Sequence, residues 1–140
     1  MKNMQYYLDT NILIFALFDQ DSLTSQVSRI VFDPSDGLLA SSLVVNELIH
    51  LYKTKKLGRR ECKSTQEVFE RIDELGIQII PLNRKHLETC ANLYIVKDHN
   101  DPIDHAIIAQ AICDRKPLIS SDQKFSDYES QKLNFVFNKR

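Results

Sequence analysis

The sequence lacks several features that would mark particular classes of protein. No apolar run reaches 18 residues, so we expect no membrane span. The N-terminal MKNMQYYLD has an acid at position 9 and does not resemble a signal peptide. Only three cysteines are present, at positions 62, 90 and 113, and no two form a CxxC pair. This spacing favours reduced thiols in a cytoplasmic protein over disulfides or a zinc site.

Neither sign of charge is in excess. The chain has 18 Lys and Arg against 19 Asp and Glu, which gives a formal net charge of −1 at pH 7. Net charge therefore does not indicate a nucleic-acid partner, and only local clusters of basic residues can do so. The chain has 140 residues, of which 43% are hydrophobic, and it shows no repeat and no linker. We therefore expect residues 1–140 to form a single domain.

Segments with the patterns of strands and helices alternate along the chain. We expect strands at residues 4–8, 38–41, 77–81, 117–120 and 135–137. We expect helices at residues 10–18, 23–32, 43–53, 60–75, 85–96 and 101–115. This alternation predicts an α/β fold of three layers, α/β/α, around a central and mainly parallel sheet.

Four acidic residues stand where such a sheet would bring them together. Asp9 directly follows the first expected strand, and Asp122 follows the strand at 117–120 by one residue. Glu47 lies about a turn and a half into the helix that follows the second strand, and Asp104 lies in the first turn of the helix opened by Asp101. Parallel sheets bind ligands at the carboxyl ends of their strands, where the strand order reverses. We therefore expect the four carboxylates at one edge of the sheet.

Carboxylates gathered in this way repel one another. Two like charges at about 4 Å cost roughly 4 kcal/mol at an effective dielectric constant of about 20. Such a cluster persists when a cation neutralises it or when some of the acids are protonated. Ligand sets made of oxygen alone favour Mg²⁺ or Mn²⁺. Because such an ion can activate water and stabilise a pentavalent phosphoryl transition state, the cluster points to phosphoryl chemistry.

Each of the four acids also has a structural explanation when taken alone. Asp9 and Asp122 are placed to cap the helices that follow them. Asp104 suits the first turn of its helix because of the helix dipole and capping-box geometry. Glu47 fits an exposed helix position in a mostly apolar segment. From the single residues, both explanations stay open.

Four segments match a known pattern in order: YYLDTNILIFAL, SSLVVNELIHL, HNDPIDHAIIAQAI and LISSDQKF. Together they cover nearly the whole chain and resemble the PIN domain, and within it the VapC-type toxins of toxin–antitoxin pairs. The resemblance implies a sheet sandwiched by helices and cleavage of RNA with Mg²⁺ or Mn²⁺. It also implies a small cognate antitoxin as a partner and a homodimer. We therefore expect a metal-dependent endoribonuclease that hydrolyses RNA phosphodiester bonds and acts as a toxin.

The resemblance also assigns roles by position. It makes Asp9, Glu47, Asp104 and Asp122 the catalytic and metal-binding residues. We expect Asp9 and Asp104 to be the principal ligands, with Asp122 helping to hold the metal or its water shell. Glu47 is either a ligand or the base. Asp101, the other aspartate of the NDPID motif, fits a helix cap better than the metal site.

Several polar residues near the acids are expected to play supporting parts. Thr10 and Asn11 flank the first acid and match residues that orient it or a water molecule. Ser120 occupies a place where relatives often have Ser or Thr. His105 stands where relatives often have Arg, and we expect it to face solvent rather than RNA. Asp127 could supply a fifth acid, but a surface position is favoured.

The densest run of positive charge follows the helix expected at 43–53. It consists of Lys53, Lys55, Lys56, Arg59 and Arg60, with Lys63 beyond Glu61. Contacts from these residues to phosphates would give salt-dependent RNA binding. The same stretch and its apolar neighbours could instead engage a partner protein, or form a solvated loop between helices.

Other functions fit the sequence less well. The main alternative is a PIN-fold nuclease outside toxin–antitoxin systems, acting in RNA processing or decay. Nucleases of ribosomal RNA maturation usually carry an extra zinc-binding segment, which three scattered cysteines do not supply. Structure-specific DNA nucleases of the same broad fold tend to be longer. A non-catalytic scaffold would not need all four acids. A receiver-like domain needs a lysine after a late strand, whereas Lys116 precedes its strand.

Overall fold

The computed structural model describes residues 4–55 and 57–140. Its strands are β1 (Gln5–Leu8), β2 (Gly37–Ser41), β3 (Ile77–Ile80), β4 (Leu118–Ser120) and β5 (Phe135–Phe137). Its α-helices are α1 (Thr10–Phe18), α2 (Ser25–Phe32), α3 (Ser42–Thr54), α4 (Thr65–Glu74), α5 (Arg84–Asn92) and α6 (Pro102–Asp114). Two 3-10 segments complete the described elements, η1 (Gln20–Ser22) and η2 (Gln123–Gln131).

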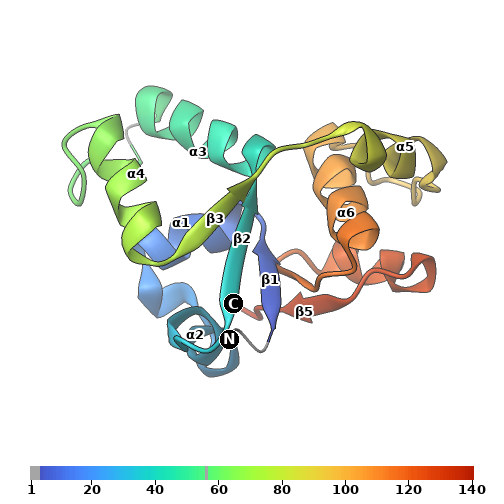
Figure 1. Ribbon diagram of the computed structural model, residues 1–140, viewed down its shortest axis with the longest axis horizontal. Coiled ribbons are helices and arrows are strands. Elements are labelled where there is room, and N and C mark those ends of the chain that lie inside the picture. The colour runs from blue at the N-terminus through green and yellow to red at the C-terminus, as the bar shows by residue number, and fades with distance from the viewer. Residues whose placement is uncertain (1–3, 56) are drawn as a thin grey trace.

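The five strands form one sheet in the order β3-β2-β1-β4-β5, and every pair of neighbours is parallel. Right-handed crossovers place the helices that connect β1, β2 and β3 on one face of such a sheet and those between β3 and β5 on the other. Figure 1 shows this division, with α1 to α4 on one side of the sheet and α5 and α6 on the other. The predicted α/β/α fold with a parallel sheet is confirmed.

The core forms where the sheet meets the helices of the first half of the chain. All five residues of β2 are buried, as expected of a parallel strand covered on both faces. Helix α1 is buried from Ile12 to Leu17, because it contacts β1 and β4 as well as α3. A short helix that is apolar all round can lie only inside a core. Its first turn is thereby fixed at the carboxyl end of β1.

The order of the strands reverses between β1 and β4, the two central neighbours of the sheet. From β1 the chain moves outward to β2 and β3, then crosses back to β4 and β5. The backbone N–H of Asp9 donates to the Ile119 carbonyl at 3.1 Å, which extends the pairing of β1 and β4 to their carboxyl ends. The crevice expected at such a reversal therefore opens beside Asp9.

Two predicted helices, at 60–75 and 85–96, extend well beyond the observed ones. The helix expected at 60–75 begins only at Thr65, because the Ser64 hydroxyl accepts the Glu67 N–H at 3.2 Å and caps it there. The helix expected at 85–96 ends at Asn92, because side chains of η2 form hydrogen bonds with the backbone that follows. The Gln131 side chain bonds the backbone N–H and carbonyl of Tyr94. Gln131 belongs to η2, so the local periodicity of residues 85–96 does not reveal where this helix ends.

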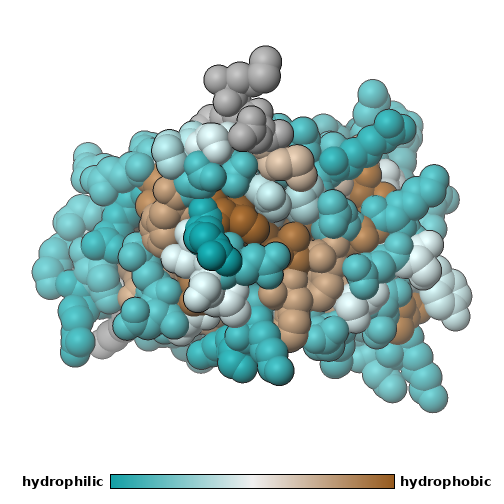
Figure 2. Space-filling model, turned by 90° about the horizontal axis from the view of Figure 1, so that it is seen from below, coloured by the Kyte–Doolittle hydropathy of each residue, from teal (hydrophilic) through white to brown (hydrophobic). Residues whose placement is uncertain are grey.

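Figure 2 shows the edge of the molecule opposite the carboxyl ends of the strands. Apolar residues lie in the middle of this face, and hydrophilic residues form most of its outline. In the part of the chain that is described, no helix combines the length and the apolar character needed to cross a membrane.

Two glycines adopt a left-handed backbone that other residues rarely take. Gly58, in the turn after α3, has a φ of 78°, and Gly76, between α4 and β3, has a φ of 70°. A Cβ added at Gly58 would lie 2.6 Å from Cζ of Phe18, whereas one added at Gly76 would have no neighbour within 4 Å. The backbone conformation therefore disfavours a Cβ at both positions, but only Gly58 also lacks the space for one.

We expect Gly58→Ala to lower the free energy of unfolding by roughly 2 to 5 kcal/mol, since the left-handed conformation costs roughly 1–2 kcal/mol and displacing the Phe18 ring roughly 1–3 kcal/mol. Gly76→Ala is the matched control and should lose only the first contribution. Urea denaturation of both variants measures the difference. Equal losses would show that the close approach of Phe18 is without consequence.

Candidate active site

A pocket of about 230 Å³ lies at the carboxyl edge of the sheet. It brings together five acids from four separate parts of the chain. The lining residues are Asp9, Thr10, Asn11, Glu47, Leu51, Asp101, Asp104, Asp122 and Phe125. All four acids predicted from the sequence therefore lie in one pocket, and so do the predicted supporting residues Thr10 and Asn11. Neither lysine nor arginine is among the described residues that line it.

Asp9 is the buried acid of the pocket and lies between β1 and α1. One of its oxygens, Oδ1, accepts the Ile12 N–H at 2.9 Å and so caps α1. The Ser120 hydroxyl, at the end of β4, donates to the same carboxylate. The structural explanation of Asp9 and its place in the pocket are thus compatible. Capping fixes the side chain at the reversal point, where the pocket opens.

Glu47 reaches the pocket from α3 and is half-buried. The Thr10 hydroxyl donates to its Oε1. Thr10 therefore orients the second acid of the pocket, whereas the sequence led us to expect it beside the first. This bond joins the first residue of α1 to α3, two helices that also pack on each other.

Asp101 and Asp104 both come from the start of α6. Asp101 is its N-cap, with Oδ1 accepting the Ile103 N–H at 2.9 Å, as predicted. It also lines the pocket, which the sequence pattern did not indicate. Asp104, one turn on, accepts a hydrogen bond from His99 at 3.0 Å through Oδ2. Since residues three apart share a helix face, both aspartates can point to the same space.

Asp122 is exposed and lines the pocket from a position two residues beyond β4. Its Oδ1 accepts the Lys124 N–H at 3.0 Å and caps η2. Its own N–H donates to Oγ of Ser120 at 2.9 Å. Ser120 thus contacts both Asp9 and Asp122 and sets the spacing of two acids. The ligand atoms of His99, Asp104 and Asp122 all lie within 4.8 Å of one another.

The electrostatics of the pocket favour a bound cation. Burial raises the pKa of Asp9 from 3.8 to about 7, and the charges of Asp104 and Asp122 add to the rise. Burial also raises the pKa of Asp104, with Asp101 and Asp122 contributing. Ionising all of these acids without a counter-charge is therefore costly. A divalent ion would remove that cost, and a donor set of carboxylate oxygens fits Mg²⁺ or Mn²⁺.

Two further residues depart from the expectation or support it. His105 does not simply face solvent, because its Nε2 bonds the backbone carbonyl of His99 at 2.7 Å. This contact holds the loop before α6 and cannot be read from a sequence pattern. Asp127 is exposed and is absent from the pocket lining, in line with the surface position favoured for it.

The basic stretch leaves α3 beyond the pocket. Lys53, Lys55, Arg59, Arg60 and Lys63 are exposed, and Lys56 lies outside the described residues. Arg59 lies over the Tyr52 ring, with its Cζ 4.3 Å from the ring centroid, and its Nε donates to the Tyr52 carbonyl at 3.2 Å. Arg60 falls in the turn before α4 and not within a helix. Glu47 and Lys53 are about 9 Å apart along the α3 axis at 1.5 Å per residue.

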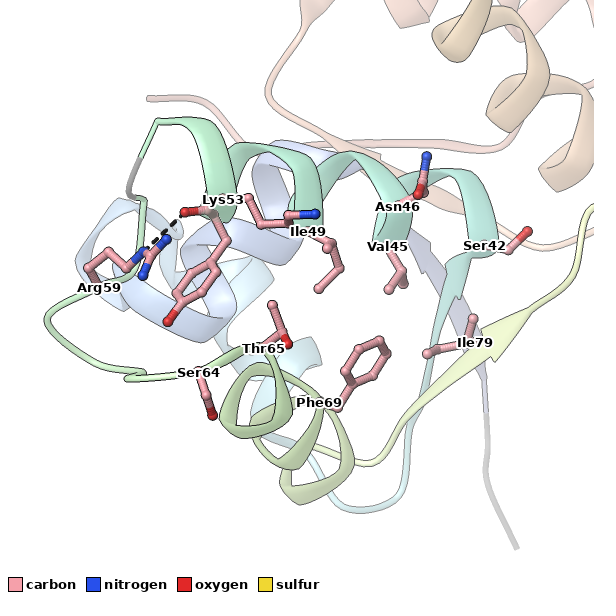
Figure 3. Close-up of a pocket in the computed structure, with 11 residues that line it drawn as sticks. Ser42, Val45, Asn46, Ile49, Lys53, Arg59, Ser64, Thr65, Phe69 and Ile79 are labelled. Atoms are coloured by element: carbon pink, nitrogen blue, oxygen red, sulfur yellow. Dashed lines mark hydrogen bonds between the residues drawn. The ribbon is translucent and has the colours of Figure 1, made fainter.

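A second, larger pocket of about 680 Å³ lies between α3 and α4, where β3 closes one end. Figure 3 shows Val45, Ile49, Phe69 and Ile79 pointing into it from these three elements. The side chains of Lys53 and Arg59 stand at its other end. This groove is thus apolar inside and basic at one rim. Helix α3 separates it from the acidic pocket and lines both.

The comparisons with known proteins agree with this geometry. A family model described as PIN domain matches residues 6–130. A chain of VapBC2 from Rickettsia felis, bound to a DNA fragment from its promoter, is 19% identical with a TM-score of 0.68, covering 97% of this chain and 100% of that chain. A chain of DNA-bound VapBC from Salmonella typhimurium is 13% identical with a TM-score of 0.67, covering 96% of this chain and 98% of that chain.

A domain of a functionally unknown protein from Methanocaldococcus jannaschii is 14% identical with a TM-score of 0.60, covering 98% of this chain and 92% of that chain. At such identities, the likeness to these solved structures concerns the fold alone. No curated protein matches the sequence.

The raised pKa of Asp9 predicts how stability depends on pH. Between pH 3.8 and about 7, the folded chain keeps a proton on Asp9 that the unfolded chain has released. The contribution of Asp9 to the free energy of unfolding is therefore present below this window and is lost as the pH rises through it. We expect metal-free protein to lose melting temperature between pH 5 and 8 more steeply than Asp9→Asn does. Calorimetry of both proteins over that range measures the difference.

Added Mn²⁺ should restore more of the melting temperature at pH 8 than at pH 5, because the ion competes with the Asp9 proton. Parallel pH profiles of wild type and Asp9→Asn would contradict the shifted pKa.

Proposed function

Because this chain belongs to the PIN domain family, whose members are nucleases, we propose that it is a metal-dependent endoribonuclease and the toxin of a type II toxin–antitoxin pair. The observation that carries the proposal is the pocket of five acids at the reversal of strand order. A pocket with this much negative charge and no lysine or arginine in its described lining repels a phosphate unless a cation is bound. Binding of a divalent ion is therefore the first requirement of the proposed reaction.

We assign the cation to Mg²⁺ or Mn²⁺, held by Asp9, Asp104 and Asp122. A bound divalent ion would polarise the phosphodiester and supply an activated water for in-line attack on phosphorus. Asp9 contributes a carboxylate that the protein already holds by two hydrogen bonds, from Ile12 and Ser120. A preorganised ligand of this kind loses little rotamer entropy when the ion binds.

Glu47 completes the proposed machinery. Thr10 engages one of its oxygens, and the bond fixes the carboxylate toward the pocket. The second oxygen is then available to hold the ion or to accept the proton of the attacking water. Either role requires Glu47 to stay in place while substrate binds. Thr10 serves this purpose from the helix that Asp9 caps.

RNA binding would be supported by the basic residues beyond α3. Lys53 is about 9 Å from Glu47 along the α3 axis, but six residues turn the helix by about 240°, so Lys53 faces the apolar groove instead. Lys55 and Arg60 are exposed and lie outside the apolar groove, so we assign them to phosphates. Such contacts make binding weaker at higher salt.

We assign the groove between α3 and α4 to the antitoxin. Two of the structures that this chain is similar to are VapBC complexes, and the groove has the character of a protein-binding site. Its four apolar side chains suit the apolar face of an amphipathic segment, and Lys53 and Arg59 suit acidic residues at the end of that segment. Because α3 lines both the groove and the acidic pocket, a segment in the groove lies close to the proposed active site.

We expect Asp9→Asn to reduce RNA cleavage by more than the roughly 10–100-fold that losing an outer-shell partner of a metal ligand costs. Asparagine caps a helix about as well as aspartate, so the fold should persist. The measurement is cleavage of total RNA in Mg²⁺, in Mn²⁺ and in EDTA. The matched control is Asp127→Asn, which removes an exposed acid outside the pocket. Cleavage that continues in EDTA, or with Asp9→Asn, would sink the proposed mechanism.

We expect Phe69→Asp to weaken antitoxin binding at least tenfold without changing cleavage of total RNA, since buried aromatic anchors carry much of the energy of an interface. The side chain is 41% exposed, so the fold should tolerate the change. Leu87→Asp is the control, because Leu87 is 53% exposed on α5, away from the groove. The binding partner in a calorimetric titration is the purified product of a short adjacent reading frame. Equal effects of the two substitutions would contradict the assignment of the groove.

A further inference from the structure

We propose that His99 is a positioning residue of the acidic pocket: its Nε2–H donates to Oδ2 of Asp104 and aims that carboxylate at the bound cation. This inference rests on the proposed function, because it presumes that Asp104 holds a metal. It assigns a role to a residue outside the acidic set, in the loop between α5 and α6. The supporting contacts reach from this loop to α6 and η2.

His99 lies within hydrogen-bond distance of Asp104 in a largely buried position. The ring Nε2 lies 3.0 Å from Asp104 Oδ2, and the side chains are 5% and 23% exposed, respectively. A hydrogen bond to a carboxylate with so little competing water is stronger than a neutral one. The bond engages Oδ2, so that Oδ1 is left for the cation.

The position of the imidazole proton follows from the partners on both sides of the ring. Nδ1 lies 2.9 Å from the Tyr128 hydroxyl, whose oxygen also accepts the Val96 N–H at 3.2 Å. With that oxygen accepting from the backbone, the hydroxyl proton is free to go to Nδ1. The neutral ring then carries its proton on Nε2, facing a carboxylate that can only accept. Hydrogen bonds thus run without interruption from Val96 through Tyr128 and His99 to Asp104.

Packing contacts also hold the His99 ring in place. It packs against Tyr128 at 5.4 Å between centroids and against Phe125 at 6.0 Å. The His105 ring stands nearly perpendicular to it at 4.9 Å and bonds its backbone carbonyl. Asp98, the preceding residue, has a φ of 67°, a left-handed conformation that is uncommon for residues other than glycine. Aromatic contacts on several sides therefore restrict the rotation of the imidazole.

Asp104 needs such a partner more than the other acids do. Asp9 and Asp122 are fixed by the backbone N–H groups that they cap, and Glu47 by the Thr10 hydroxyl. At the start of α6 the capping position is occupied by Asp101. The carboxylate of Asp104 is therefore ordered by His99. Partners of this kind typically change metal affinity by roughly 10–100-fold.

A second buried His–Asp pair provides a matched control within the same chain. His86, from α5, places Nε2 2.9 Å from Oδ1 of Asp114, and its Nδ1 accepts the Asn83 N–H at 3.0 Å. Asp114 ends α6, about 15 Å along the helix from Asp104 at 1.5 Å per residue. Substituting His86 thus breaks a similar bond to the same helix without touching the acidic pocket.

The test measures Mn²⁺ affinity of the full chain by electron paramagnetic resonance, which does not depend on RNA cleavage. We expect His99→Phe, which keeps an aromatic ring but removes the donor, to weaken Mn²⁺ binding by roughly 10–100-fold. His99→Gln retains an N–H that reaches Asp104 and should recover most of the affinity. His86→Phe should bind Mn²⁺ as wild type does. Thermal melts confirm that each variant is folded.

Several results would overturn the role of His99. These are wild-type affinity in His99→Phe, an equal loss in His86→Phe, no recovery in His99→Gln, or no Mn²⁺ binding by wild type. Pulsed resonance that detects a histidine nitrogen bonded to Mn²⁺ would make His99 a ligand and also overturn it. If His99→Phe does not fold, Tyr128→Phe decides: it should weaken Mn²⁺ binding in the same direction, and unchanged affinity is the contrary result.

Cleavage of total RNA is measured separately on the same samples. Mn²⁺ binding without any cleavage by wild type would refute the nuclease proposal. The Mn²⁺ affinities of the His99 variants would still decide whether His99 positions Asp104.

Discussion

Repulsion between carboxylates that the fold forces together is the constraint on which the rest of the structure depends. Asp9 and Asp122 stand at the ends of two neighbouring strands, and Glu47, Asp101 and Asp104 converge on them from α3 and α6. The described lining of the pocket holds no lysine or arginine to compensate them. The pKa values of Asp9 and Asp104 are raised, chiefly by burial and further by the neighbouring acids. Structural stability is thereby traded for a site that is complete only with a cation, which is a common property of functional sites.

The hydrogen bonds around the pocket explain how that repulsion is contained. Asp9, Asp101 and Asp122 each cap a helix or 3-10 segment, so helix N-termini with their partial positive charge surround the acids. The hydroxyl groups of Thr10 and Ser120 donate hydrogen bonds to Glu47 and Asp9, respectively. Capping and metal binding are therefore not competing explanations. The hydrogen bonds from Ile12 and Ser120 that hold the Asp9 carboxylate in place also favour its charged form.

Helix α3 links the two pockets of the molecule. One face presents Glu47 and Leu51 to the acids, and another presents Val45 and Ile49 to the apolar groove. Residues two apart on a helix point in different directions, so Val45 and Ile49 face the groove while Glu47 faces the acidic pocket. A partner in the groove and a substrate in the acidic pocket would thus contact opposite sides of one rigid element. This arrangement gives a physical route by which a bound partner can affect the proposed active site.

The sequence by itself determined the alternation of strands and helices, the parallel sheet, and the places of the four acids after strands or in early helical turns. These features follow from local periodicity and from capping residues next to each other in the chain. Only the tertiary structure decided that Thr10 orients Glu47, that Asp101 lines the pocket, and that His99 engages Asp104. The end of α5 was decided in the same way, by contacts from η2. The bond between His99 and Tyr128 joins positions 29 residues apart. No local pattern encodes such a contact, because it exists only once β4 has brought η2 beside the start of α6.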